Sequence, residues 1–174
     1  MRMTKKLFIL CFFLVFAASC ETYKDYEIGY SPIYPLSGEW LVRVTNTSVT
    51  PNVTSALLVL STFNAADNST TQMWIRATST SATYFGRFDG KIDCNVTDKS
   101  FSGSSTSNTY YTTATVPTTQ TFTITGGTIV TDGYDTATGG KSDLIIFTIT
   151  DTRKPGITYT CKGFRRTRWL DDEV

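Results

Sequence analysis

Histidine is absent from this 174-residue sequence. Because Ser-His-Asp and Cys-His catalytic groups need an imidazole base, its absence excludes them, together with metal sites built on histidine. The Gly-x-Ser-x-Gly turn of α/β-hydrolases is missing as well. A serine nucleophile would then need a lysine base, and Lys99 and Lys141 remain open for that role, although the Ser-x-x-Lys spacing does not occur after residue 19.

An excess of charge of one sign is lacking too. Lys and Arg together number 16 and Asp and Glu 15, which gives a formal net charge of +1. Such a near-neutral chain offers no electrostatic basis for binding nucleic acid. Runs of helix-favouring Ala, Leu, Glu and Lys are scarce after residue 20, whereas Thr, Tyr, Phe and Val recur. This composition favours an all-β protein.

A pair of carboxylates is the remaining kind of catalytic group to consider, and the spacing of the candidates here does not suit it. Asp89 and Asp93 lie four residues apart on one strand, which separates them by roughly 13 Å. Glycosidases need two carboxyl groups about 5–10 Å apart. We therefore interpret this pair as part of a solvated face, and the acidic residues 171–173 as a disordered tail. No catalytic residue, cofactor or metal ion is expected.

The N-terminus has the pattern of an exported lipoprotein. A basic start (residues 2–6) precedes an apolar run (7–16) that is too short to span a bilayer comfortably. The following Ala-Ala-Ser-Cys resembles a bacterial lipobox, in which Cys20 is acylated and anchors the mature chain to a membrane. The alternative is an ordinary secretory signal with a chance cysteine. We expect a signal peptide (1–19), a lipidated cysteine with a proline-containing tether (20–36) and one domain (37–174).

Two alternating runs predict the first and last strands. Gly38-x-Trp40 opens a run in which Trp40, Val42 and Val44 fall on one face and residues 41, 43 and 45 on the other, which is typical of a strand with one buried face. Residues 159–166 alternate in the same way and end in paired arginines. If these strands are neighbours, Arg165 can stack on the Trp40 indole, and the sheet closes without free edges. Gly38, Trp40 and Arg165 are thus predicted to be structural.

The last strand also carries a basic cluster, made of Lys162, Arg165, Arg166 and Arg168. The structural interpretation is that one arginine covers Trp40 and that the others are solvated. The functional alternative is that a member of the cluster holds a ligand carboxylate or phosphate.

Turn residues divide the rest of the chain into short strands. We expect them at 56–63, 72–79, 84–96, 110–116, 120–130 and 142–150, with serine-rich 100–109 as a loop and 132–140 as a long turn. Eight strands in all suit an up-and-down antiparallel β-barrel. A two-sheet β-sandwich is the main alternative.

Two further cysteines follow Cys20. Secretion would place Cys94 and Cys161 in an oxidising compartment, and each shares a strand face with apolar neighbours, so we expect a disulfide between them. Without histidine or a Cys-x-x-Cys pair they cannot form a zinc site.

Aromatic and apolar residues recur at strand spacing, and a small barrel can hold one ligand in its interior. The residues predicted to line that interior are Trp74, Tyr84, Phe88, Phe122, Ile124 and Tyr159.

Five segments in order carry a resemblance to a known family: residues 30–40, 63–68, 72–75, 91–94 and 158–167. Together they resemble the lipid-binding putative hydrolases, which are lipoproteins of Gram-negative anaerobes. The resemblance implies a lipocalin-like (calycin) barrel on an outer-membrane lipoprotein that faces the periplasm or the cell surface.

Three functions follow as expectations. The first is non-catalytic binding of a small hydrophobic ligand, a lipid or fatty acid, inside the barrel of a protein assumed to be monomeric. The second is a cell-surface carbohydrate-binding or adhesin-like module that uses Tyr110, Tyr111 and Tyr134. The third is a lipid hydrolase, which the missing histidine disfavours.

Overall fold

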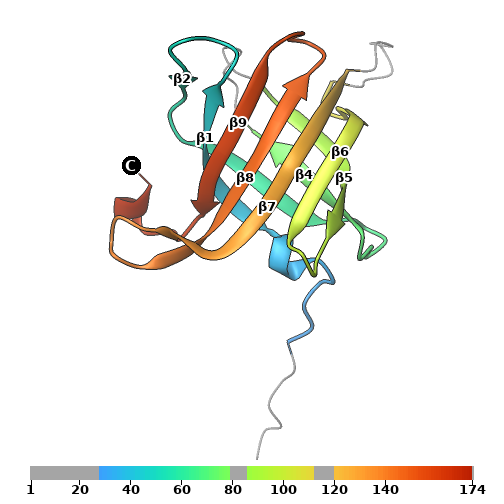
Figure 1. Cartoon of the computed structure of the whole chain (residues 1–174). Helices are drawn as coiled ribbons and strands as arrows, with labels where there is room; N and C mark the ends of the chain where they lie inside the picture. The colour runs from blue at the N-terminus through green and yellow to red at the C-terminus, as the bar shows by residue number, and fades with distance from the viewer. Residues whose placement is uncertain (1–27, 79–85, 112–119, 174) are drawn as a thin grey trace, which may run out of the picture. The chain divides into compact units, whose positions relative to one another are not determined.

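The computed structural model describes residues 28–78, 86–111 and 120–173. Its strands form one antiparallel sheet that closes into an eight-stranded barrel (Figure 1). They are β1 (Gly38–Asn46), β2 (Val53–Thr54), β3 (Leu58–Asn64), β4 (Gln72–Ala77), β5 (Phe88–Asn95), β6 (Ser100–Ser107), β7 (Thr121–Asp135), β8 (Lys141–Asp151) and β9 (Thr158–Arg165). Two short 3-10 helices, η1 (Tyr34–Leu36) and η2 (Leu170–Asp172), precede and follow them.

The barrel closes where the first strand meets the last. From β3 to β9 each strand pairs with the next along the chain, and β1 pairs with both β3 and β9. The two-residue β2 pairs with the far end of β1, beyond the β3 partners. The expected up-and-down β-barrel is thus confirmed. The sandwich alternative is wrong, because all the described strands belong to a single closed sheet.

The alternation in β1 sorts its side chains as the sequence predicts. Trp40, Val42 and Val44 are at most 1% exposed, whereas Arg43 is exposed on the other face. In β9, Tyr159 and Cys161 face inward in the same way, and Trp40 pairs directly with Arg165 across the β1–β9 ladder. The inward residues of both strands belong to one apolar core inside the barrel.

The η1 segment seals one end of this core. Ile33 and Leu36 are fully buried there. The Trp40 Nε1–H donates to the Thr62 hydroxyl at 2.9 Å, and that hydroxyl donates to the Leu36 carbonyl at 2.6 Å. The barrel unit therefore includes residues that the sequence assigns to the tether. The reason is that Pro35 lies at the start of a helical turn, where its fixed φ is favourable, rather than in an extended arm.

Serine-rich 100–109, which the sequence predicts as a loop, instead contains β6. Phe101 and Gly103 are buried and alternate with exposed serines, so small side chains conceal a regular strand pattern. The strand predicted at 110–116 is wrong at its start, because Tyr110 and Tyr111 form a turn, and its remainder lies outside the described residues.

The β7–β8 hairpin is longer than predicted. β7 continues to Asp135, through the residues expected to begin a turn, and its tip contacts the C-terminal segment. The carboxylate of Asp172 accepts from the Thr138 N–H at 2.9 Å and from the Thr167 hydroxyl at 2.7 Å, and Asp172 is buried. The predicted disordered tail is therefore wrong, because its acidic groups have partners on the barrel.

Candidate functional site

The closed end of the barrel is built around Trp40. The guanidinium carbon of Arg165 lies 4.6 Å from the centre of the indole ring, and its Nε donates to Asp143 at 3.1 Å. Gly38 leaves the space for this contact, since a Cβ at that position would lie 2.6 Å from Arg165 Nη1. Arg165 is thus the ring partner that the sequence predicts, and the contact is structural.

The other arginines of the basic cluster are also paired. Arg166 donates to Glu39 and Glu173 at 2.5–2.6 Å, and Arg168 lies 3.2 Å from Glu39. The hydrogen bonds that Arg166 donates to Glu173 and to Glu39 raise the pKa of Arg166, and the bond to Glu173 lowers the pKa of that carboxyl group. These pairs join the C-terminal segment to β1, so the arginines here serve the fold rather than a ligand.

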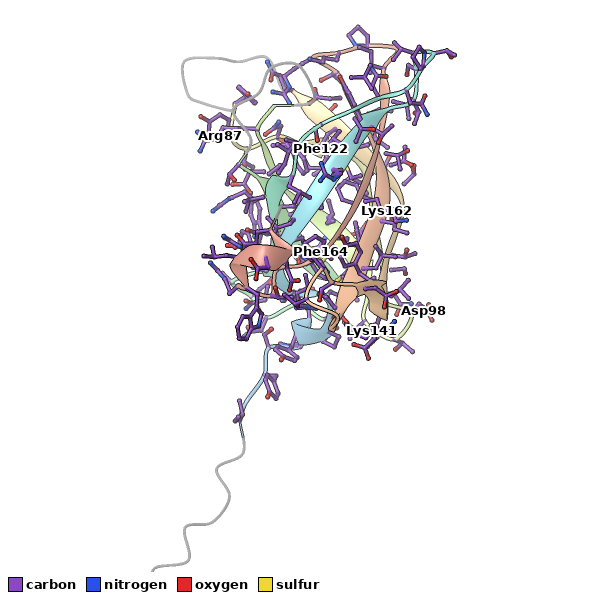
Figure 2. All side chains as sticks on the ribbon, turned by 90° about the vertical axis from the view of Figure 1, so that its left-hand side faces the viewer. Arg87, Asp98, Phe122, Lys141, Lys162 and Phe164 are labelled. Carbon is purple, nitrogen blue, oxygen red and sulfur yellow. The ribbon has the colours of Figure 1, made fainter. Side chains whose placement is uncertain are left out.

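Four residues predicted to line the interior form one layer at the opposite end, which we call the mouth. Phe88, Phe122, Ile124 and Tyr159 are each at most 1% exposed. The rings of Phe88 and Phe122 lie 4.9 Å apart, and a Cβ at Gly90 would lie 2.7 Å from Phe122 Cζ. The labelled Phe122 lies toward the end away from η1 (Figure 2). All four side chains are therefore buried inside the barrel, and their role in ligand binding stays a prediction.

A polar group lies within this apolar layer. Burial raises the pKa of Tyr159, and the nearby charge of Asp151 raises it further. The phenol therefore stays protonated at neutral pH and can donate a hydrogen bond inside the mouth.

Trp74 does not belong to this layer, and its predicted interior position is wrong. Met73 and Ile75 on either side of it are fully buried, so Trp74 points outward, where its ring stacks parallel to Phe63 with centroids 6.4 Å apart. The period-2 rule already placed Trp74 on the face of two polar neighbours, and its aromatic character was a misleading signal. Tyr84, the sixth predicted residue, lies outside the described residues.

The predicted disulfide requires correction. Cys94 on β5 and Cys161 on β9 are both buried, and both are free thiols. Four strand-to-strand steps separate β5 from β9 in either direction around the barrel, so the two cysteines lie on opposite walls. A disulfide needs its two Cα atoms about 4.4–6.8 Å apart. Sharing an inward face was therefore not evidence of contact.

The rim of the mouth carries an ion pair that the sequence reasoning missed. Asp151, at the end of β8, is only 4% exposed. Both of its carboxylate oxygens lie 2.9 Å from the Nε of Arg153, whose guanidinium sits 4.4 Å over the Tyr111 ring. An Asp-x-Arg triplet at a strand end, just before Pro155, is the signal that could have found this pair.

A second arginine lies on the same rim. The guanidinium of Arg87 sits 4.4 Å over the Tyr110 ring and donates to its hydroxyl at 2.7 Å. Tyr110 and Tyr111 meet edge to face at 4.8 Å. The four side chains, Arg87, Tyr110, Tyr111 and Arg153, therefore form a continuous row, which we call the rim row. Two of the three tyrosines expected to bind glycans, Tyr110 and Tyr111, are thus engaged with arginines, whereas the third, Tyr134, stacks on Phe164.

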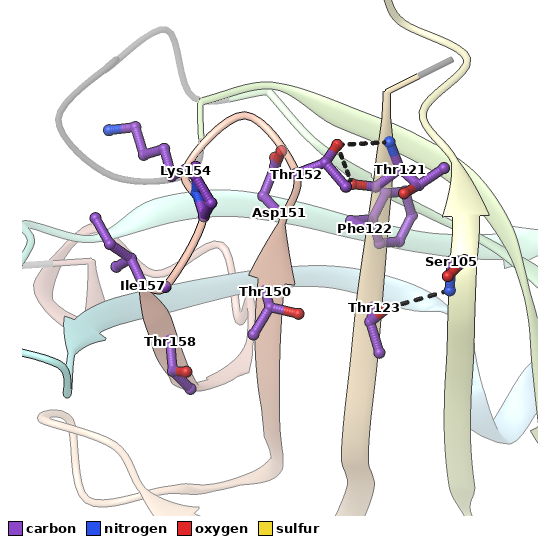
Figure 3. A pocket seen from close by; sticks show the side chains of 12 residues that line it. Ser105, Thr121, Phe122, Thr123, Thr150, Asp151, Thr152, Lys154, Ile157 and Thr158 are labelled. Carbon is purple, nitrogen blue, oxygen red and sulfur yellow. Dashed lines mark hydrogen bonds between the residues drawn. The ribbon is translucent and has the colours of Figure 1, made fainter.

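A pocket of about 340 Å³ opens beside the rim at the β8–β9 turn (Figure 3). The turn contributes Lys154 and Ile157, and the strands contribute Phe122 and Asp151. Ile157 packs against the core, and Phe122 belongs to the interior layer. The pocket therefore lies at the surface beside the apolar layer, and the rest of its lining is mostly threonine.

The described residues show no catalytic pair. The Nζ of Lys99 contacts the Thr131 hydroxyl, and that of Lys141 pairs with Asp135. Burial strongly raises the pKa of the Cys161 thiol, which keeps it protonated and unreactive. Within the described part of the chain, no group of three or more His, Cys, Asp or Glu residues could hold a metal ion.

Comparison with known proteins agrees with the fold. No helix in the described ranges is long and apolar enough to cross a membrane. A search among curated proteins found no match to the chain. Residues 25–170 match the family described as lipid-binding putative hydrolase, which spans the whole barrel and most of the sequence. The chain therefore belongs to the lipid-binding putative hydrolase family.

Proposed function

We propose that this protein binds a lipid or fatty acid at the mouth of its barrel and does not transform it. The observation that carries the proposal is the apolar layer of Phe88, Phe122, Ile124 and Tyr159, which lies directly beneath a rim rich in arginine. An acyl chain would contact the layer, and burial of each CH₂ group would contribute about 0.8 kcal/mol. Membership of a lipid-binding family supports the same class of ligand.

The rim supports an anionic head group. Arg87, Arg153 and Lys154 surround the entrance, and Asp151 is the carboxylate already paired there. Arg87 has the Tyr110 hydroxyl as its hydrogen-bond partner and no carboxylate among the described residues. A fatty-acid carboxylate or lipid phosphate at the entrance would accept charge-assisted hydrogen bonds from such a group.

The absence of a nucleophile–base pair among the described residues supports binding without hydrolysis. The lipobox at Cys20 supports an acylated N-terminus that holds the protein on a membrane, and the family resemblance supports the outer membrane, on its periplasmic or surface side. In this proposal the protein acts as a monomer, and the exchange of ligand with the membrane needs no further partner.

The test uses palmitate and a photoactivatable fatty acid on the purified protein. Native mass spectrometry should detect one bound palmitate, and the photoproduct should map to peptides that contain Phe88, Phe122 or Tyr159. Excess palmitate should prevent the labelling. A protein that remains free of ligand, or labelling confined to the outer-face pair Phe63 and Trp74, would refute interior binding.

A matched pair of substitutions tests the head-group contact. Arg87→Met should weaken palmitate binding several-fold and leave binding of hexadecanol, which has no charge, unchanged. Arg76→Met makes the same change on the outer face, where Arg76 pairs with Asp89 at 2.8 Å, and should affect neither ligand. Equal effects of the two substitutions would contradict a head-group site at the rim.

A further inference from the structure

A second groove lies outside the barrel, on the outward faces of β1 and β9. It has a volume of about 250 Å³. Its floor is formed by Arg43 and Thr45 of β1 and by Lys162 and Gly163 of β9. The segment between β2 and β3 contributes Leu57 to one side, and the β7–β8 hairpin contributes Tyr134 to the other.

Two cations face each other across this floor. Arg43 and Lys162 are direct partners in the β1–β9 ladder, and both are exposed. Like charges directly opposite on neighbouring strands are destabilising unless something compensates them. Within the described ranges no carboxylate lies within ion-pair distance of either group, and the contact of Arg43 is a 3.4 Å hydrogen bond to the Ser55 carbonyl.

This arrangement contrasts with the rest of the basic cluster on β9. Arg165 is matched by Asp143, and Arg166 and Arg168 are matched by Glu39. Lys162 is the member of the cluster that has no carboxylate partner among the described residues. Its cross-strand partner, Arg43, adds a second positive charge beside it. The fold therefore concentrates uncompensated positive charge at one place, inside a groove.

The walls of the groove are apolar and aromatic. The rings of Tyr134 and Phe164 stack at 4.3 Å with an interplanar angle of 9°, and Phe164 is only 2% exposed beneath its partner. Leu57 faces this stack from the opposite wall. The hydroxyl of Thr45, bonded to that of Thr54 at 2.9 Å, adds a polar group on the floor. Because one face of the Tyr134 ring packs on Phe164, the ring is held rigidly, and its other face can stack on another flat group.

We propose that this groove is a binding site for a small organic anion, a carboxylate or phosphate monoester that carries a flat ring. The anionic group lies between Arg43 and Lys162, and the ring lies against Tyr134 and Leu57. The volume of about 250 Å³ admits one ring with its substituent. Because Lys162 points away from the interior, this site is separate from the mouth and does not depend on lipid binding there.

Phenyl phosphate titrated into the ¹⁵N-labelled protein tests the proposal by NMR. Saturable shifts are expected at the amides of Gly163 and Thr45, with a dissociation constant in the millimolar range or tighter, on the order of 1 mM. Benzyl alcohol has a similar ring without the charge and should not bind. Inorganic phosphate has the charge without the ring and should bind more weakly than phenyl phosphate.

Charge-removing variants provide the control. Lys162→Met and Arg43→Met should each weaken phenyl phosphate binding at least about tenfold. Lys91→Met removes one positive charge from β5, where Lys91 lies 3.6 Å from Asp67, and should bind like the original protein. Absence of saturable shifts with the original protein would overturn the proposal. Unchanged affinity in both groove variants would overturn it as well. Two separate variants are used so that misfolding of one cannot decide the result.

Discussion

The hydrogen-bond relay at the closed end offers a sharp test of how this barrel is held together. Trp40 Nε1–H donates to Thr62 Oγ1, which in turn donates to the Leu36 carbonyl, and all three residues are at most 3% exposed. Thr62→Val keeps the shape of the side chain and removes the hydroxyl. It leaves one buried donor and one buried acceptor without a partner, each of which costs about 1–3 kcal/mol.

We therefore expect Thr62→Val to lower the free energy of unfolding by about 2–6 kcal/mol. Small domains have total stabilities of about 5–15 kcal/mol, so the loss would be a large fraction of the whole. With a mid-range urea dependence of about 2 kcal/mol per molar, the unfolding midpoint should fall by roughly 1–3 M. The assay is urea unfolding followed by tryptophan fluorescence and by far-UV circular dichroism.

Thr62→Ser is the matched control. It keeps both hydrogen bonds and loses one buried methyl group, which should cost only about 1 kcal/mol. If Thr62→Val proves as stable as Thr62→Ser, or more stable, the relay does not hold η1 on the barrel and the reasoning is refuted.

Three further outcomes can be measured directly. Cys94 and Cys161 should both react with iodoacetamide in denaturant without prior reduction, and should be protected in the folded protein; a reduction-dependent mass change would contradict free thiols. The pKa of the Glu173 carboxyl is lower in the folded protein than in the unfolded chain. The ion pair with Arg166 therefore contributes its full stability above the unfolded pKa, and this contribution is lost as the pH falls through the folded pKa. The protection factors of amides near Arg166, which compare their exchange with that of an unstructured chain at the same pH, should therefore fall below about pH 4, and Glu173→Gln should abolish this fall. Arg165→Lys should lower the unfolding midpoint, because ammonium cannot reproduce the planar stack, whereas equal stability would make the ring contact dispensable.

Both proposed sites depend on the same property of a barrel. In each strand, one set of side chains faces the interior and the alternate set faces outward. Phe122 and Tyr159 thus line the mouth, while Lys162 belongs to the outer groove, three residues from Tyr159 on the same strand. One short strand can in this way serve two ligands of different chemistry.

Strand periodicity let the sequence determine much of this protein. Trp40 and Phe88 were placed inside correctly because side chains alternate strictly along a strand, whatever the strand pairs with. Arg165 was matched to Trp40 because closing a meander makes its first and last strands neighbours. The same rule, applied without weight on aromatic character, would have placed Trp74 outside. These are local properties, or follow from the order of strands.

Tertiary structure decided what depends on distance across the barrel. Cys94 and Cys161 share an inward face, yet they lie on opposite walls, since their separation depends on how many strands close the sheet. Lys162 and Arg166 belong to the same basic cluster but have different neighbours. Glu39 and Glu173 pair with Arg166, whereas the cross-strand partner of Lys162 is another cation, Arg43. Alternation determines the face of a side chain, but only the closed sheet determines its neighbours, and the neighbours determine whether a charge is matched within the fold or left for a ligand.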